Sequence, residues 1–120
     1  MKIAFTANGS DLDATIDRRF GRAERFLIVD SDSESCTVLD NSQNLNAAQG
    51  AGIQAAQNVA ESGTTILITG HTGPKAFRVL TAAGIEIYQA GKETVRENLA
   101  AWRAGTLIKL DDADVEGHWV

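Results

Sequence analysis

The chain has 120 residues, 43% of them hydrophobic, and a formal net charge of −5. This length suits one ordinary domain, with enough apolar side chains to build a core. The negative charge argues against general nucleic-acid binding, which needs a basic face. No apolar stretch is long enough to cross a membrane, and the start of the chain does not resemble a secretory signal. We therefore expect a single-domain cytoplasmic protein, with a monomer as the default at this size.

The first half of the chain predicts three strands, at 2–7, 24–30 and 35–40. A short polar turn separates the second from the third, which favours an antiparallel hairpin with Cys36 and Val38 on one face. Between the first two strands, the spacing of Leu12 and Ile16 predicts one loose helical turn.

The second half alternates helical and strand patterns, which predicts parallel strands joined by right-handed crossovers. The predicted elements are helices at 53–61, 74–83 and 94–103 and strands at 64–69 and 85–89.

Together these patterns predict an α/β fold with a five-stranded mixed sheet in one three-layer α/β/α domain over residues 1–110. An acidic tail follows at 111–120. Ligands of such sheets bind beyond the carboxyl ends of the parallel strands. The loops 8–20, 41–52 and 70–75 are expected to converge there. The stretch within 41–52 is rich in asparagine and glutamine and has no regular pattern, which is typical of a functional loop.

A glycine-rich turn, Gly-His-Thr-Gly-Pro-Lys at 70–75, links the central strand to the next helix. Glycine permits the turn, and Pro74 suits the first helical position because its missing N–H is not needed there. The free N–H groups and positive dipole of this helix point beyond the sheet, and Lys75 adds charge. We interpret the turn as an anion-binding floor, although it does not match a P-loop. A purely connecting turn is the alternative.

A group of arginines, Arg18, Arg19 and Arg22, surrounds Phe20 in the first loop. Arginine suits bidentate contacts to large, diffuse anions, and Gly21 lets the backbone approach a ligand closely. The alternative is a solvated face with Phe20 in the core.

Cys36 and His71 are the candidate metal ligands. A soft thiolate would favour copper or an iron–sulfur species, but one cysteine cannot build a cluster site by itself. The alternative for Cys36 is a small buried hydrophobe, and for His71 an ordinary loop histidine. The sequence shows no zinc-site spacing and no Ser/His/Asp or Cys/His set. It therefore gives little indication of an enzyme.

Several motifs follow one another in a specific order. Asp-x-Arg-Phe-Gly-Arg-Ala at 17–23 precedes a Phe-x-Ile-Val-Asp strand at 26–30. Asn41 follows the third strand, Gly-x-Gly-Ile opens a helix at 50–53, and Gly-x-x-Gly-Pro-Lys-Ala-Phe begins at Gly70. With this set of motifs the chain resembles the dinitrogenase iron–molybdenum cofactor biosynthesis family over residues 1 to about 110.

The resemblance implies a ribonuclease-H-like motif without nuclease chemistry, in a non-enzymatic protein that binds, carries or protects a metal–sulfur cofactor. It implies a molybdenum–copper–sulfide cluster held non-covalently, with the iron–molybdenum cofactor or its precursor as the alternative. Backbone N–H groups, arginines and apolar walls would hold such a cluster, because one cysteine is too few to ligate it. The residues expected at the cofactor site are Arg18, Arg19, Phe20, Arg22, Asn44, Gly50, Gly70, His71, Thr72, Gly73 and Lys75.

Two alternatives from other classes stay open. A regulatory or protein-interaction module without a cofactor is suggested by the acidic tail, which carries Trp119 near its end. A small hydrolase or phosphate-binding enzyme is suggested only by the helix N-terminus at 74. The sequence identifies no protein partner.

Overall fold

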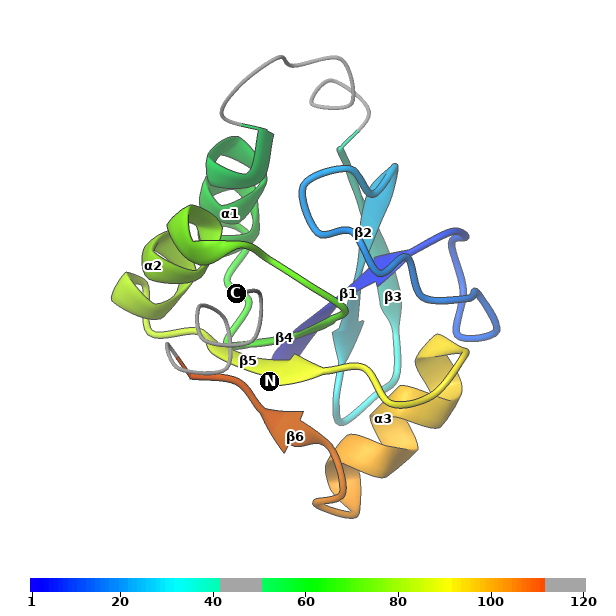
Figure 1. Ribbon diagram of the computed structural model, residues 1–120. Helices are drawn as coiled ribbons and strands as arrows, with labels where there is room; N and C mark the ends of the chain where they lie inside the picture. Colours follow the sequence, from blue (N-terminus) through cyan, green and yellow to red (C-terminus); the bar gives the residue numbers. More distant parts are fainter. Residues whose placement is uncertain (42–50, 112–120) are drawn as a thin grey trace.

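A computed structural model describes residues 1–41 and 51–111 (Figure 1). The strands are β1 (Lys2–Ala7), β2 (Arg25–Asp30), β3 (Cys36–Asp40), β4 (Ile66–Thr69), β5 (Glu86–Gln89) and β6 (Ile108–Lys109). The helices are α1 (Ala51–Glu61), α2 (Pro74–Ala82) and α3 (Val95–Arg103).

The strands form one mixed sheet in the order β3-β2-β1-β4-β5-β6. The neighbours β1, β4 and β5 are parallel, as the alternating pattern predicts. β2 pairs antiparallel with both β1 and β3. The register of the β2–β3 pair places Cys36 and Val38 on one face, as expected. The sheet therefore combines a parallel centre with an antiparallel edge.

The expectation of five strands is wrong, because β6 adds a sixth. The chain turns back after α3 and pairs Ile108 with Gln89 and Lys109 with Tyr88. A strand of two residues is too short to show an alternating pattern. Its formation depends on the open edge of β5, which supplies the hydrogen-bond partners.

The helices cover the two faces of the sheet and make three layers. α1 and α2 pack on one face, where Phe26, Leu67 and Ile87 meet side chains such as Leu80. α3 packs on the other face, where Leu99 joins the apolar side chains of the central strands (Figure 1). In the part of the chain that the structure describes, no helix is long and apolar enough to cross a membrane.

The loop between β1 and β2 contains no helical turn, contrary to the expectation from Leu12 and Ile16. Ile16 instead forms a bridge with Ala7, and Thr15 forms one with Thr94 at the start of α3. The amide of Ile16 donates to the carbonyl of Glu93 at 2.9 Å. Ile16 is buried because it pairs with the end of β1 and packs against the α3 layer, so tertiary pairing overrides the four-residue spacing.

Candidate functional site

Two loops meet beyond the carboxyl ends of β1 and β4, as the sequence predicts. The amide of His71 donates to the carbonyl of Arg18 at 2.9 Å, and the amide of Phe20 donates to the carbonyl of His71 at 3.1 Å. These bonds form a short parallel bridge between Arg19 and His71. The partners are some fifty residues apart in sequence, so the parallel pairing of β1 and β4 brings the loop at 8–24, here called the arginine loop, to the glycine turn.

Gly70 is the point of closest contact between the two loops. A Cβ on Gly70 would lie 2.6 Å from the Cα and the carbonyl oxygen of Arg18, closer than real Cβ atoms approach backbone. Gly73 differs, because its φ is 77° and a Cβ there would meet no atom within 4 Å. The two glycines of the turn therefore serve different purposes, the first a close approach and the second a left-handed conformation.

Buried hydrogen bonds among Thr6, Asp17 and Thr69 fix the arginine loop on the sheet. The hydroxyl of Thr6 donates to the carbonyl of Asp17, and the hydroxyls of Thr6 and Thr69 lie 2.8 Å apart. The amide of Asp17 donates back to the carbonyl of Thr6 at 3.0 Å. All three residues are buried, so these hydrogen bonds are shielded from water.

Two of the predicted arginines hold the loop in place. The guanidinium of Arg18 donates to the carbonyl of Ala90 at 3.1 Å, beyond the end of β5. Arg19 donates through Nε and Nη2 to the two oxygens of Asp17, each at 3.2 Å. This hydrogen-bonded contact with Asp17 raises the pKa of Arg19 above its ordinary value. Arg18 and Arg19 therefore have structural partners at the rim of the site.

Asn41 organises the segment that carries Arg22. Its fully buried side-chain amide donates to the carbonyl of Ala23 at 2.7 Å and to that of Gly21 at 3.4 Å. Arg22 lies between these two carbonyls and is exposed. From the sequence, Asn41 was identified only as part of a family motif. Its side-chain contacts could be seen only in the structure.

Phe20 lies in the core beneath the loop. Its side chain is 1% exposed, and its ring centroid is 5.2 Å from that of Phe26. Phe20 is therefore a core residue, as the alternative interpretation expects, and its contact with a ligand stays a prediction. Burial of Phe20 anchors the arginine loop over the α1 and α2 layer.

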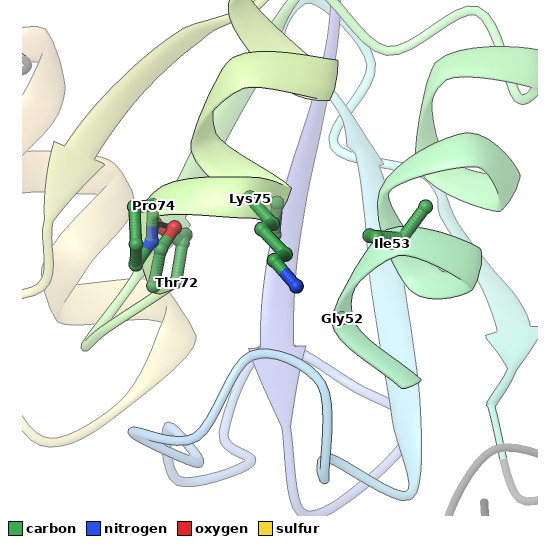
Figure 2. A pocket seen from close by; sticks show the side chains of 7 residues that line it. Gly52, Ile53, Thr72, Pro74 and Lys75 are labelled. Atoms are coloured by element: carbon green, nitrogen blue, oxygen red, sulfur yellow. Dashed lines mark hydrogen bonds between the residues drawn. The ribbon is translucent and has the colours of Figure 1, made fainter. Parts of the chain in front are cut away.

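A pocket of about 560 Å³ lies between the first turns of α1 and α2. Figure 2 shows Lys75 extending from α2 into this space, across from Gly52 and Ile53 on α1. The first amides of a helix have no partner within it, so two positive helix ends and the Lys75 ammonium face one pocket. The pocket is lined by Gly52, Ile53, Thr72, Gly73, Pro74, Lys75 and Ala76.

The predicted site residues other than Phe20 divide into three groups. Thr72, Gly73 and Lys75 line the pocket. Asn44 and Gly50 lie outside the described residues. The joined loops carry Arg18, Arg19, Gly70 and His71, with Arg22 on the arginine loop near its Asn41 anchor.

Sequence reasoning missed Gly52 and Ile53 as site residues. Both belong to the Gly-x-Gly-Ile motif that opens α1, so this motif carried the signal. A Cβ on Gly52 would lie 3.5 Å from the Cβ of Ala76, which is ordinary contact. The small residues at this point let the starts of the two helices come close together.

The two candidate metal ligands lie apart. His71 follows β4, whereas Cys36 is exposed on β3, with β2 and β1 between them in the sheet. Partial burial and the charges of Asp11 and Glu34 raise the pKa of the Cys36 thiol, which disfavours the thiolate that binds metals. Within the described ranges, no three His, Cys, Asp or Glu residues gather as a metal site. The pocket offers N–H groups and positive charge, which suit an anion.

Comparison with known proteins shows what this chain is similar to. The family model described as Dinitrogenase iron-molybdenum cofactor matches residues 1–105. The apo form of the orange protein from Desulfovibrio gigas is 42% identical, with a TM-score of 0.87 over 91% of this chain and 92% of that chain. A NifB-like protein from Thermotoga is 34% identical, with a TM-score of 0.78 over 91% and 92% of the two chains. An uncharacterised protein from Methanocaldococcus jannaschii is 29% identical over 92% of each chain.

Proposed function

We propose, on the premise that this chain belongs to the dinitrogenase iron–molybdenum cofactor family, that it is a non-enzymatic carrier of an anionic metal–sulfur cluster. A molybdenum–copper–sulfide cluster is our first candidate, and the iron–molybdenum cofactor or its precursor is the second. The likeness to the orange protein and the family match support a cofactor-binding role. The ribonuclease-H-like motif and the cytoplasmic location stay predictions.

The observation that carries the proposal is the pocket between the two helix starts. A sulfide cluster with negative charge needs hydrogen-bond donors, positive charge and apolar walls, because it is large and polarisable. The amides of the first turn of α2 and the Lys75 ammonium supply the first two. Ile53, Pro74 and Ala76 supply apolar walls. The described lining contains no thiolate or imidazole, so we expect non-covalent binding.

Each residue near the pocket has a role in this proposal. Lys75 would neutralise charge directly, and Thr72 and Gly73 would present backbone groups to the cluster. Arg22 would add positive charge from the neighbouring loop, which Asn41 holds. Arg18, Arg19, Gly70 and His71 would shape the rim. Asn44 and Gly50, outside the described residues, stay predicted site residues.

Anaerobic purification tests the proposal. We expect the isolated protein, or the protein supplied with tetrathiomolybdate and copper, to show visible absorption bands and stoichiometric molybdenum by elemental analysis. Iron together with molybdenum would instead favour the iron–molybdenum alternative. A colourless protein that takes up no molybdenum, copper or iron under these conditions would refute the carrier role.

A pair of matched variants tests the site. Lys75→Ala with Arg22→Ala removes the positive charge of the pocket lining and one charge of the neighbouring loop. It should lower the retained molybdenum at least about tenfold, because in this proposal both charges act on one anion. Lys2→Ala with Lys109→Ala removes the same charge from exposed positions away from the pocket lining and should leave retention unchanged. Equal retention by the two double variants would contradict the site.

A further inference from the structure

β3 forms one edge of the sheet and differs from the opposite edge. No strand in the described ranges pairs with its outer side. β6, at the other edge, has only two residues, whereas β3 has five, Cys36–Asp40. β3 contains no proline, lysine or arginine, which are the residues that commonly protect a sheet edge from pairing. β3 therefore has the length and composition of a strand that can accept another.

The backbone of β3 presents regularly spaced hydrogen-bonding groups outward. The amide of Asp30 donates to the carbonyl of Ser35 at 3.0 Å, and the amide of Asn41 donates to the carbonyl of Glu24 at 2.9 Å. In an antiparallel pair, alternate residues bond to the neighbouring strand. The residues of β3 that turn their backbone groups away from β2 are therefore Cys36, Val38 and Asp40.

Apolar surface accompanies these outward groups. The side chain of Val38 is 46% exposed, although Leu27, its partner on β2, is fully buried. The helices of the α1 side cover β3 only in part, and a hollow of about 290 Å³ remains there. Leu39 and Asp40 line this hollow from β3, and Asn58, Glu61 and Ser62 line it from the end of α1. A strand added at this edge would have an apolar contact on one face and a hollow on the other.

The hollow is acidic. Glu61 contributes a carboxylate, and the carboxyl end of α1 adds the negative end of a helix dipole. Among the residues that line the hollow, none is a lysine, arginine or histidine. A long basic side chain suits such a place, because its stem can lie along Leu39 while its charge reaches the Glu61 carboxylate. The negative charge of the hollow thus favours a partner segment with basic side chains.

We propose that the edge of β3 binds an extended, basic segment of a partner protein, which adds to the sheet as an antiparallel strand. Apolar side chains of the segment would lie beside Val38, and alternate lysines or arginines would enter the hollow near Glu61. A second copy of this chain fits less well, because symmetric pairing of two β3 strands would bring two acidic edges together. This interaction surface is separate from the pocket at the starts of α1 and α2 and does not depend on the cluster.

A synthetic peptide tests the backbone pairing. The probe is a capped peptide of about nine alternating lysine and valine residues, the length of an ordinary strand. With lysines toward the hollow, the valine amides face β3. N-methylation of the valines should therefore weaken binding, measured by calorimetry, at least about tenfold, because several hydrogen bonds are lost. N-methylation of the lysines should have little effect. Equal affinity of the two methylated peptides, or no binding of the unmodified peptide at millimolar concentration, would overturn the proposal.

Variants of the protein test the edge itself. Val38→Pro removes an amide that faces outward and leaves the bonds to β2 intact, which an edge strand tolerates. It should weaken peptide binding about fivefold or more, whereas Val38→Ala should weaken it less. Circular dichroism and cluster uptake serve as controls, because both should match those of the parent protein. Unchanged peptide affinity in a folded Val38→Pro protein would overturn the proposal.

Two further measurements test the charge of the hollow and the self-association of the protein. Glu61→Gln should weaken binding of the lysine peptide about threefold and reduce its salt dependence, since one ion pair near the surface is lost. Glu93→Gln, at an exposed position outside the hollow, should do neither. A concentration-dependent dimer of the parent protein that Val38→Pro abolishes would identify a second copy as the occupant and overturn the basic-partner assignment.

Discussion

The two ends of the sheet hold their connecting loops in different ways. At the carboxyl ends of β1 and β4, segments far apart in sequence bond through their backbones, as His71 does with Arg18 and Phe20. At the opposite end, the β2–β3 turn is held mainly by side chains. A carboxylate oxygen of Asp30 accepts from the amides of Asp32 at 2.8 Å and Ser33 at 3.1 Å.

α3 supports this second turn through one exposed side chain. Arg103 donates to a carboxylate oxygen of Glu34 at 2.7 Å and also to the carbonyl of Ser31. The pocket end is thus fixed by shape and buried hydrogen bonds, whereas the turn end is fixed by charges in contact with water. We expect substitutions at the pocket end to cost several times more stability than substitutions at the turn end.

The largest effect is expected at the closest backbone contact. Gly70→Ala should lower the free energy of unfolding by about 3 kcal/mol, because its Cβ would overlap the backbone of Arg18 and the loops would have to separate. Urea denaturation measures this loss. Gly52→Ala is the matched control, since its Cβ would meet Ala76 at an ordinary 3.5 Å. Equal losses in the two variants would show that the close approach at Gly70 does not fix the loop.

The next effect concerns the anchor of the arginine loop. Asn41→Ala should cost about 2 kcal/mol, because the buried hydrogen bond to the carbonyl of Ala23 and the part-buried one to that of Gly21 are lost. Asn58→Ala, which removes only an exposed bond to Gln54, should be nearly neutral. Denaturation curves for both variants separate the two cases. A neutral Asn41→Ala would mean that water replaces the side chain and that the loop does not need this anchor.

A smaller effect is expected at the second glycine of the turn. Gly73→Ala should cost about 1 kcal/mol, since φ is 77° but no atom lies within 4 Å of the added Cβ. Comparing this loss with that of Gly70→Ala separates backbone strain from steric overlap. If Gly73→Ala were the more damaging of the two, the conformation of the turn would matter more than its contact with the arginine loop.

At the turn end, Arg103→Ala should cost at most about 1 kcal/mol, because the two side chains of the ion pair are 41% and 42% exposed. The loss should shrink further at high salt, where exposed charges are screened. Thermal melts at low and high ionic strength measure both effects. A large, salt-independent loss would place this pair among the buried contacts and remove the difference between the two ends.

The smallest effect is a pH dependence from Asp30. The amides of Ser33 and Asp32 lower its pKa below the ordinary value of 3.8, so the folded protein binds its proton less readily than the unfolded chain does. This contribution to stability is therefore present above that value and is lost as pH falls through the lowered pKa. The stability difference between the parent protein and Asp30→Asn should be constant near neutral pH and shrink in acid. A difference that grows in acid would contradict this assignment.

The sequence by itself determined the elements with strong local patterns. The bounds expected for β1 are those observed, and the expected helices and other strands agree within one or two residues at most ends. Apolar periodicity, glycine and proline act within a few residues, so they can be read without the fold. The meeting of the arginine loop with the glycine turn was also predicted from the sequence, because parallel strands place their carboxyl ends at one edge of the sheet.

Only the tertiary structure decided the features that depend on distant partners. β6 exists because β5 has an open edge, and Ile16 is extended because Ala7 and α3 lie beside it. The burial of Phe20 and the contact of Gly70 with Arg18 arise in the same way. Such contacts join residues of different elements, and the local sequence pattern does not indicate which backbone groups or side chains will face each other. The sequence therefore placed the predicted loops at the end of the sheet where the pocket lies, and the fold selected the residues that line the pocket.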